Sequence, residues 1–140
     1  MSDPTCGFCA IVADPAQAHV LWADSTFVAF LDRAPIAPGH LMIVPRRHEP
    51  YLFALPPAEY MALFARVRLL AEPLRRTVGA DRIALAVEGY GMPHTHVHLV
   101  PINGLGELDP HRQRPAAGED LARMAATLRP AFAELRAGTA

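Results

Sequence analysis

The chain has 140 residues, 51% of them hydrophobic, and a formal net charge of −1. This length favours one domain, residues 1–140, with a buried core, and the balanced charge argues against disorder and against a polybasic surface for nucleic acid. No apolar run is long enough to span a membrane and no signal peptide is visible, so we expect a cytoplasmic protein. All 13 basic residues are arginine, which excludes a lysine nucleophile or a P-loop lysine.

Both cysteines lie near the N-terminus, in the motif Cys6-Gly7-Phe8-Cys9. In a cytosolic chain such a C-x-x-C pair more often binds metal or is redox-active than forms a disulfide. A zinc site needs four ligands, and this motif supplies two. A pair of partly buried thiols without metal is the simpler alternative.

Runs of apolar and β-branched residues predict two strands over residues 17–22 and 26–31, joined as a hairpin by the turn 23–25. A loop punctuated by proline and glycine, 34–39, follows the second strand. A third strand is expected over 40–45.

Helical spacing of apolar residues predicts a long helix over residues 58–78. Pro73 lies inside this pattern and predicts a kink or an early stop, while Gly79 is suited to cap the C-terminal end. The same spacing predicts a second helix over 120–136, with a kink at Pro130.

A fourth strand is expected over 82–87, and a fifth strand follows the turn 88–93. The polar residues 103–118, rich in glycine and proline, are typical of a surface loop. Strands followed by a helix and then by more strands favour an α+β fold, with a mainly antiparallel five-stranded sheet, a long helix and a C-terminal helix.

The fifth strand carries the most informative motif, His94-Thr95-His96-Val97-His98-Leu99-Val100-Pro101. Side chains alternate between the two faces of a strand, so the three imidazoles are expected on one face, with neighbours about 6–7 Å apart. A solvated strand face that happens to carry histidine is one interpretation. A metal cluster is another, because imidazole is a common metal ligand.

Three parts of the chain together resemble the histidine triad (HIT) superfamily of nucleotide hydrolases and transferases. They are the His-x-His-x-His motif, the N-terminal C-x-x-C motif, and the pair of segments Ala29-Phe30-Leu31-Asp32 and Pro38-Gly39-His40-Leu41-Met42-Ile43-Val44-Pro45-Arg46-Arg47-His48. The resemblance covers about residues 6–102 in matching order, and the co-occurrence is more specific than any one motif. It implies a compact α+β domain that forms a symmetric homodimer whose sheets join.

The resemblance also implies a reaction. His96 would attack the α-phosphorus of a nucleotide and form a covalent nucleotidyl-imidazole, which water or another acceptor then releases. Its other ring nitrogen would be held protonated by an acceptor such as a backbone carbonyl. His98 would bond phosphate oxygens or the leaving group, and His40 would complete the network. No catalytic cofactor is expected.

Four further residues are candidates for binding the substrate, three of them by the same resemblance. Asp32 would accept from the ribose hydroxyls, although a turn-capping aspartate is an equal alternative. Phe8 and Phe30 are candidates for the base pocket, and the backbone N–H of Gly91 is a candidate phosphate contact. Here the chain departs from many family members, because the turn before the triad is short and ends in Pro93. The substrate is therefore left open: a nucleoside phosphoramidate, a dinucleoside polyphosphate, or another compound.

One branch of the superfamily binds a structural zinc ion, and its ligands match Cys6, Cys9, His48 and His94. Such a Cys₂His₂ set completes the tetrahedron that C-x-x-C leaves open. Two rival functions stay open beside the nucleotide hydrolase or transferase. One is a non-catalytic nucleotide-binding module, and the other is a metal-dependent enzyme with His94, His96 and His98 as ligands.

Overall fold

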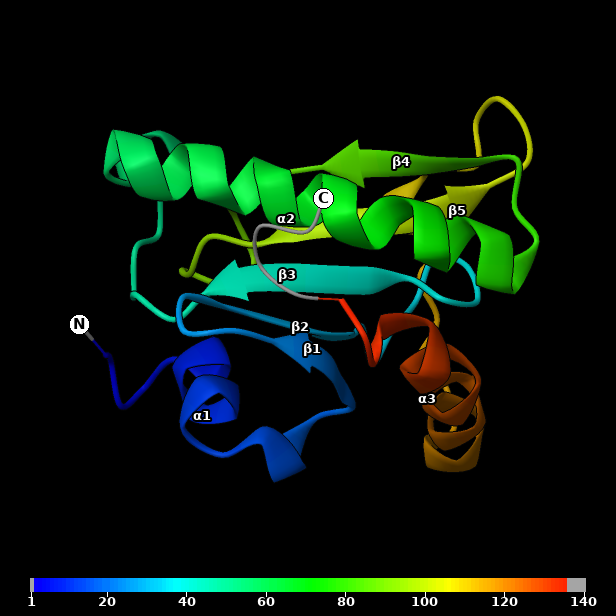
Figure 1. The fold of residues 1–140 in the computed structure, drawn as a ribbon, viewed down its shortest axis with the longest axis horizontal. Helices are drawn as coiled ribbons and strands as arrows, with labels where there is room; N and C mark the ends of the chain where they lie inside the picture. Colours follow the sequence, from blue (N-terminus) through cyan, green and yellow to red (C-terminus); the bar gives the residue numbers. More distant parts are fainter. Residues whose placement is uncertain (1, 136–140) are drawn as a thin grey trace.

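The structure is a computed structural model that describes residues 2–135. Five strands form one antiparallel sheet in the order β1-β2-β3-β5-β4 (Figure 1). The strands are β1 Val20–Ala23, β2 Phe27–Leu31, β3 Leu41–Pro45, β4 Arg82–Ala86 and β5 Val97–Ile102. The helices are α1 Gly7–Ala13, α2 Pro57–Val78 and α3 Gly118–Phe132. Three short 3-10 helices, η1 Pro15–Gln17, η2 Leu52–Ala54 and η3 Pro110–Arg112, connect them. The predicted α+β class with five antiparallel strands is confirmed.

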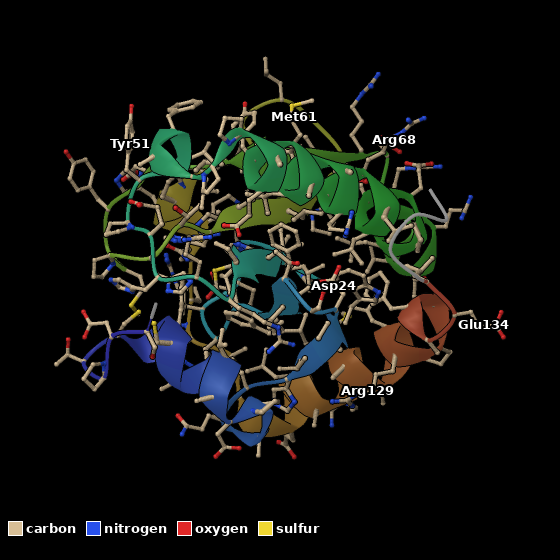
Figure 2. All side chains as sticks on the ribbon, turned by 60° about the vertical axis from the view of Figure 1, so that its left-hand side comes forward. Asp24, Tyr51, Met61, Arg68, Arg129 and Glu134 are labelled. Carbon is tan, nitrogen blue, oxygen red and sulfur yellow. The ribbon has the colours of Figure 1, made fainter. Side chains whose placement is uncertain are left out.

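Each face of the sheet packs against different helices. The main core lies on the face of Phe27, Ala29 and Leu31, where α2 and α3 supply leucines and Phe132. A smaller cluster on the other face joins Val28 and Phe30 to α1. In Figure 1, α2 lies along the β4 and β5 side of the sheet, while α1 and α3 lie towards β1. The outer face of α2 carries exposed side chains such as Met61 and Arg68 (Figure 2).

The register of the sheet aligns one row of side chains across four strands. Phe30 pairs with Met42, Met42 pairs with His98, and His98 pairs with Ala86. Directly paired residues of antiparallel strands share a face. The third histidine of the triad therefore lies on the face that α1 covers only in part.

The long helix matches the predicted range 58–78 closely and does not stop at Pro73, so of the two alternatives, a kink or an early stop, the early stop does not occur. The helix continues to Val78 and ends at Gly79, which has the left-handed φ of +73° expected for a glycine cap. Leu70 and Leu74, on either side of the proline, are fully buried. Burial of this apolar face outweighs the one backbone hydrogen bond that proline removes.

Several predicted boundaries move in the structure. The fifth strand begins at Val97 and not at His94, because the Thr95 N–H and hydroxyl both donate to the Glu49 carbonyl outside the sheet. The first strand begins at Val20, since residues 15–17 form η1, capped by the Asp14 side chain.

Both ends of the chain also differ from the prediction. The short helix α1 was not predicted. Its apolar residues Phe8, Ile11 and Val12 have helical spacing that could have indicated it. The C-terminal helix ends at Phe132, and residue 136 of its expected range lies outside the described residues. Among residues 2–135, no helix is long and apolar enough to cross a membrane.

Candidate active site and metal centre

A cavity of about 690 Å³ opens on the partly covered face of the sheet. Its walls come from α1, from side chains of β2, β3 and β5, from the turn before the triad, and from the segment after β5. Seven residues predicted for catalysis or substrate binding all line it, namely His96, His98, His40, Asp32, Phe8, Phe30 and Gly91. Residues up to 90 positions apart in the sequence therefore share one concave site.

The ring of the middle triad histidine, His96, is oriented by a backbone carbonyl two residues earlier in the chain. His96 Nδ1 lies 2.7 Å from the carbonyl oxygen of His94. Since a carbonyl only accepts, this contact places the proton on Nδ1 and leaves the Nε2 lone pair available. The ring packs edge-on against Phe8, at 5.2 Å between centroids, and only 7% of the residue is exposed. This is the arrangement a nucleophilic imidazole requires.

His40 and His98 form a directly hydrogen-bonded pair. The Ile36 N–H donates to His40 Nδ1 at 2.9 Å, so the proton of the neutral ring is on Nε2. His40 Nε2–H then donates to His98 Nδ1 at 2.8 Å. This leaves His98 with its own proton on Nε2, as a donor. The backbone just before His40 requires glycine. The φ of Gly39 is +88°, and a Cβ at this position would lie 2.9 Å from a Val78 methyl group.

Asp32 lies beside this histidine pair and also caps a turn. Its Oδ1 accepts from the Ala34 N–H at 2.9 Å, which is a turn-capping hydrogen bond. Its Oδ2 lies 3.4 Å from His40 Nε2 and 3.9 Å from His98 Nδ1. The residue is 9% exposed. One carboxylate oxygen therefore orders the loop and the other faces the histidines.

Burial keeps both members of the pair neutral. Desolvation lowers the pKa of His40, although the charge of Asp32 opposes this. Desolvation, together with repulsion from His40 and His96, lowers the pKa of His98 to about 4. At neutral pH both rings are therefore uncharged, which the hydrogen-bond chain from Ile36 through His40 to His98 requires.

We expect acid to destabilise the protein partly through His98. Because the folded pKa of His98, about 4, lies below the ordinary histidine pKa of 6.5, the unfolded chain binds more protons across this interval. Stability from His98 is thus present above pH 6.5 and is lost as pH falls through 4. Urea unfolding at pH 7 and at pH 4 should show wild type losing about 2 kcal/mol more than His98→Gln. Equal losses of stability in wild type and His98→Gln would contradict the lowered pKa of His98. His111→Gln, at an exposed position, serves as the control.

A second cluster joins the two cysteines to His48 and His94. His94 Nδ1 lies 3.5 Å from both sulfurs, and His48 Nδ1 lies 3.3 Å from Cys9 Sγ. A tetrahedral zinc ion, with about 2.3 Å to sulfur and about 2.0 Å to nitrogen, separates such ligand atoms by about 3.5 Å. A nitrogen equally distant from two sulfurs suits a shared central ion better than a single S–H···N bond. The four residues fit a tetrahedral metal site.

Further contacts orient both imidazoles of this cluster. His94 Nε2 lies 2.7 Å from the carbonyl oxygen of Pro45, so Nε2 carries the proton and Nδ1 faces the sulfurs. His48 Nε2 lies 3.7 Å from Asp3 Oδ2. Acceptors behind ligating histidines are typical of metal sites. The cluster links the start of α1 to the end of β3 and to the segment before β5.

The three triad histidines do not converge on one metal site in the described part of the chain. His94 belongs to the cysteine cluster, whereas His98 lies within metal-ligating distance of Asp32 and His40. A metal on His40 Nε2 would need the proton on Nδ1, where the Ile36 N–H already points. The second group therefore suits a hydrogen-bond network.

The cavity has lining residues that the sequence did not indicate. Glu88, Tyr90 and Met92 come from the turn before the triad, and Leu108, Pro110 and Gln113 come from the segment that was expected to be only a surface loop. No local pattern marks Leu108, Pro110 and Gln113, because they reach the cavity through the path of the chain after β5.

With this geometry established, comparisons with known proteins define the class. The family model described as HIT domain matches residues 14–104, and the chain belongs to the HIT family. An adenylylsulfatase, HINT3, from Arabidopsis thaliana is 31% identical over 101 residues, which cover 69% of this chain and 51% of that protein. The asymmetrical bis(5'-nucleosyl)-tetraphosphatase of Schizosaccharomyces pombe is 30% identical over 92 residues, covering 62% and 50%. The chain thus spans about half the length of these relatives.

Solved structures show the same fold. A HIT-like protein from Bartonella henselae matches with a TM-score of 0.80 at 21% identity, covering 94% of this chain and all of that one. A zinc-bound histidine triad family protein from Mycobacterium smegmatis matches with a TM-score of 0.77 at 29% identity, covering 93% and 94%.

Proposed function

We propose that this protein is a nucleotide hydrolase or nucleotidyltransferase that acts at an α-phosphate through a covalent intermediate on His96. The observation that carries the proposal is the Nδ1 contact of His96 with the His94 carbonyl, inside a cavity lined also by Asp32 and His98. The names of two relatives, an adenylylsulfatase and a dinucleoside tetraphosphatase, support a substrate with a nucleotidyl group.

In the proposed reaction, His96 Nε2 attacks the α-phosphorus and the bond to the leaving group breaks. A phosphorus–nitrogen bond forms, and the leaving group departs with the electron pair. His98 Nε2–H donates to a phosphate oxygen, and His40 maintains that proton's position through Nε2. Water then attacks the same phosphorus and the phosphorus–nitrogen bond breaks with its electron pair returning to Nε2. The nucleoside monophosphate leaves, the proton of the water passes to solvent, and His96 is neutral again. Asp32 would bind the ribose, and Phe8 and Phe30 would contact the base, with ring centroids 5.4 Å apart.

We also propose that Cys6, Cys9, His48 and His94 hold a structural zinc ion. The zinc-bound neighbour from Mycobacterium smegmatis supports this assignment, as does the agreement of the sulfur–nitrogen distances with a tetrahedron. The ion would supply no chemistry to the reaction. It would connect α1 to the strand ends, and so hold Phe8 against His96.

The homodimer stays a prediction. The edge strand β4 carries Leu85, which is 44% exposed, and this open edge is a surface on which a second sheet could pair.

Release of nucleoside monophosphate tests the proposed function against its two rivals. The protein is mixed in turn with an adenosine phosphoramidate, a dinucleoside tetraphosphate and adenylyl sulfate, with and without a chelator. We expect turnover of at least one of them, retained by the folded fraction after chelation. Complete loss of turnover in chelated but folded protein would favour the metal-dependent enzyme. Binding of nucleotide without turnover of any substrate would favour the non-catalytic module.

A further inference from the structure

A short segment after β5 runs alongside the loop that leads into His40. We call residues 113–116 the strap. The Arg114 N–H donates to the Pro35 carbonyl at 3.4 Å, and the Ala116 N–H donates to the Arg33 carbonyl at 3.0 Å. The Gln113 side-chain Nε2 donates to the Ala34 carbonyl at 2.9 Å. Three consecutive carbonyls of the loop are thus held by the strap, which lies outside the residues matched by the family model.

The loop that the strap holds controls the proton positions of the histidine pair. The residue after these three carbonyls is Ile36, and its N–H donates to His40 Nδ1. That contact selects the His40 tautomer with the proton on Nε2, which then donates to His98 Nδ1. Gln113 is therefore linked to His98, the residue proposed to bond the phosphate, by hydrogen bonds at the Ala34 carbonyl and at the Ile36 N–H, with the backbone of residues 34–36 between them.

Gln113 is the member of the strap that lines the cavity of about 690 Å³ around His96 and His98. Its neighbours Arg112 and Arg114 line a separate cavity of about 490 Å³ on the other side of the loop. Both arginines are exposed and donate to carbonyls within their own segment. Gln113 is only partly exposed and is the one of the three whose side chain bonds the loop.

We infer that Gln113 is a positioning residue, whose side-chain bond to Ala34 holds the loop so that the Ile36 N–H fixes the proton positions of His40 and His98. The structural part of this inference stands on the contacts alone, and its effect on turnover rests on the function proposed above. Were the loop to move, the His40 proton could shift to Nδ1. His98 would then donate to His40, and its Nε2 would present a lone pair to the phosphate in place of a proton.

Gln113→Met tests the inference, because methionine has nearly the length of glutamine and lacks the amide donor. Arg112→Met is the matched control, since it also removes one side-chain bond to a carbonyl, that of Glu107, and the Arg112 side chain makes no hydrogen bond to the loop in the described structure. Nitrogen-15 NMR of histidine-labelled protein at pH 7 reports the tautomers, and amide exchange reports the protection of Ile36. In wild type and Arg112→Met we expect one His40 tautomer, with the proton on Nε2, and slow exchange. In Gln113→Met we expect mixed tautomers and exchange faster by about tenfold.

Kinetics on the same proteins test the role in the reaction. A positioning residue should lower kcat roughly tenfold in Gln113→Met with KM changed less than about threefold, because misplaced groups impair the transition state more than binding. Unchanged tautomers in Gln113→Met, or equal changes in both variants, would overturn the inference. Mixed tautomers with unchanged kcat would also overturn it as a statement about the reaction. Absence of turnover in wild type would instead refute the proposed function, while the NMR result would still decide the structural part.

Discussion

Replacing His96 with alanine is expected to abolish the covalent intermediate and to lower kcat by at least about 10³-fold. The expectation follows from the one ring in the cavity whose Nδ1 proton is held by a backbone carbonyl and whose Nε2 takes no hydrogen bond from the described residues. No neighbouring side chain can replace it, because the nitrogens of His40 and the Nδ1 of His98 are already engaged.

Intact-protein mass after rapid quenching measures this directly. Wild type mixed with substrate should gain the mass of one nucleotidyl group, and His96→Ala should gain none. His111→Ala is the matched control, because this histidine is exposed and lies outside the cavity. His98→Ala should still form the adduct, more slowly. An adduct that persists in His96→Ala and disappears in His98→Ala would move the nucleophile to the third histidine.

Replacing Cys9 with serine is expected to release the metal and to lower the melting temperature by at least about 10 °C. Cys9 Sγ lies within 3.5 Å of the His48 and His94 imidazoles, and the residue is 4% exposed, so serine would leave the proposed ligand set incomplete in a buried place. An ion at a thousand times its dissociation constant stabilises the folded state by about 4 kcal/mol, which corresponds to a shift of this order in a domain of this size.

A chelator provides the internal control for this prediction. Chelation should lower the melting temperature of wild type to that of Cys9→Ser and should leave Cys9→Ser unchanged. Native mass spectrometry should find one zinc ion on each wild-type chain and none on the variant. If wild type carries no zinc after exposure to it, and melts at the same temperature with and without chelator, the cysteines are a buried thiol pair.

The elements that the sequence predicted well are those with a regular pattern of apolar residues. The strands around Phe27 and Leu41 and the long helix follow from hydrophobic periodicity, which depends only on near neighbours. The failures have physical causes. The helix continues through Pro73 because burial of Leu70 and Leu74 outweighs the cost of the proline. The fifth strand starts later than expected because Thr95 bonds the Glu49 carbonyl and not a neighbouring strand.

The sequence by itself determined the α+β class, because strand alternation and helical spacing are properties of short segments. Its resemblance to a known family, carried by short motifs, supplied the list of candidate residues. The family resemblance gave the three triad histidines different roles, but only the tertiary structure shows the contacts that separate them: His94 with the cysteines, His96 against Phe8, and His98 with His40. The tertiary structure also brought Gln113 to the loop before His40. These contacts join residues separated by 58 to 88 positions, and they depend on sheet register and chain path, which no local pattern encodes.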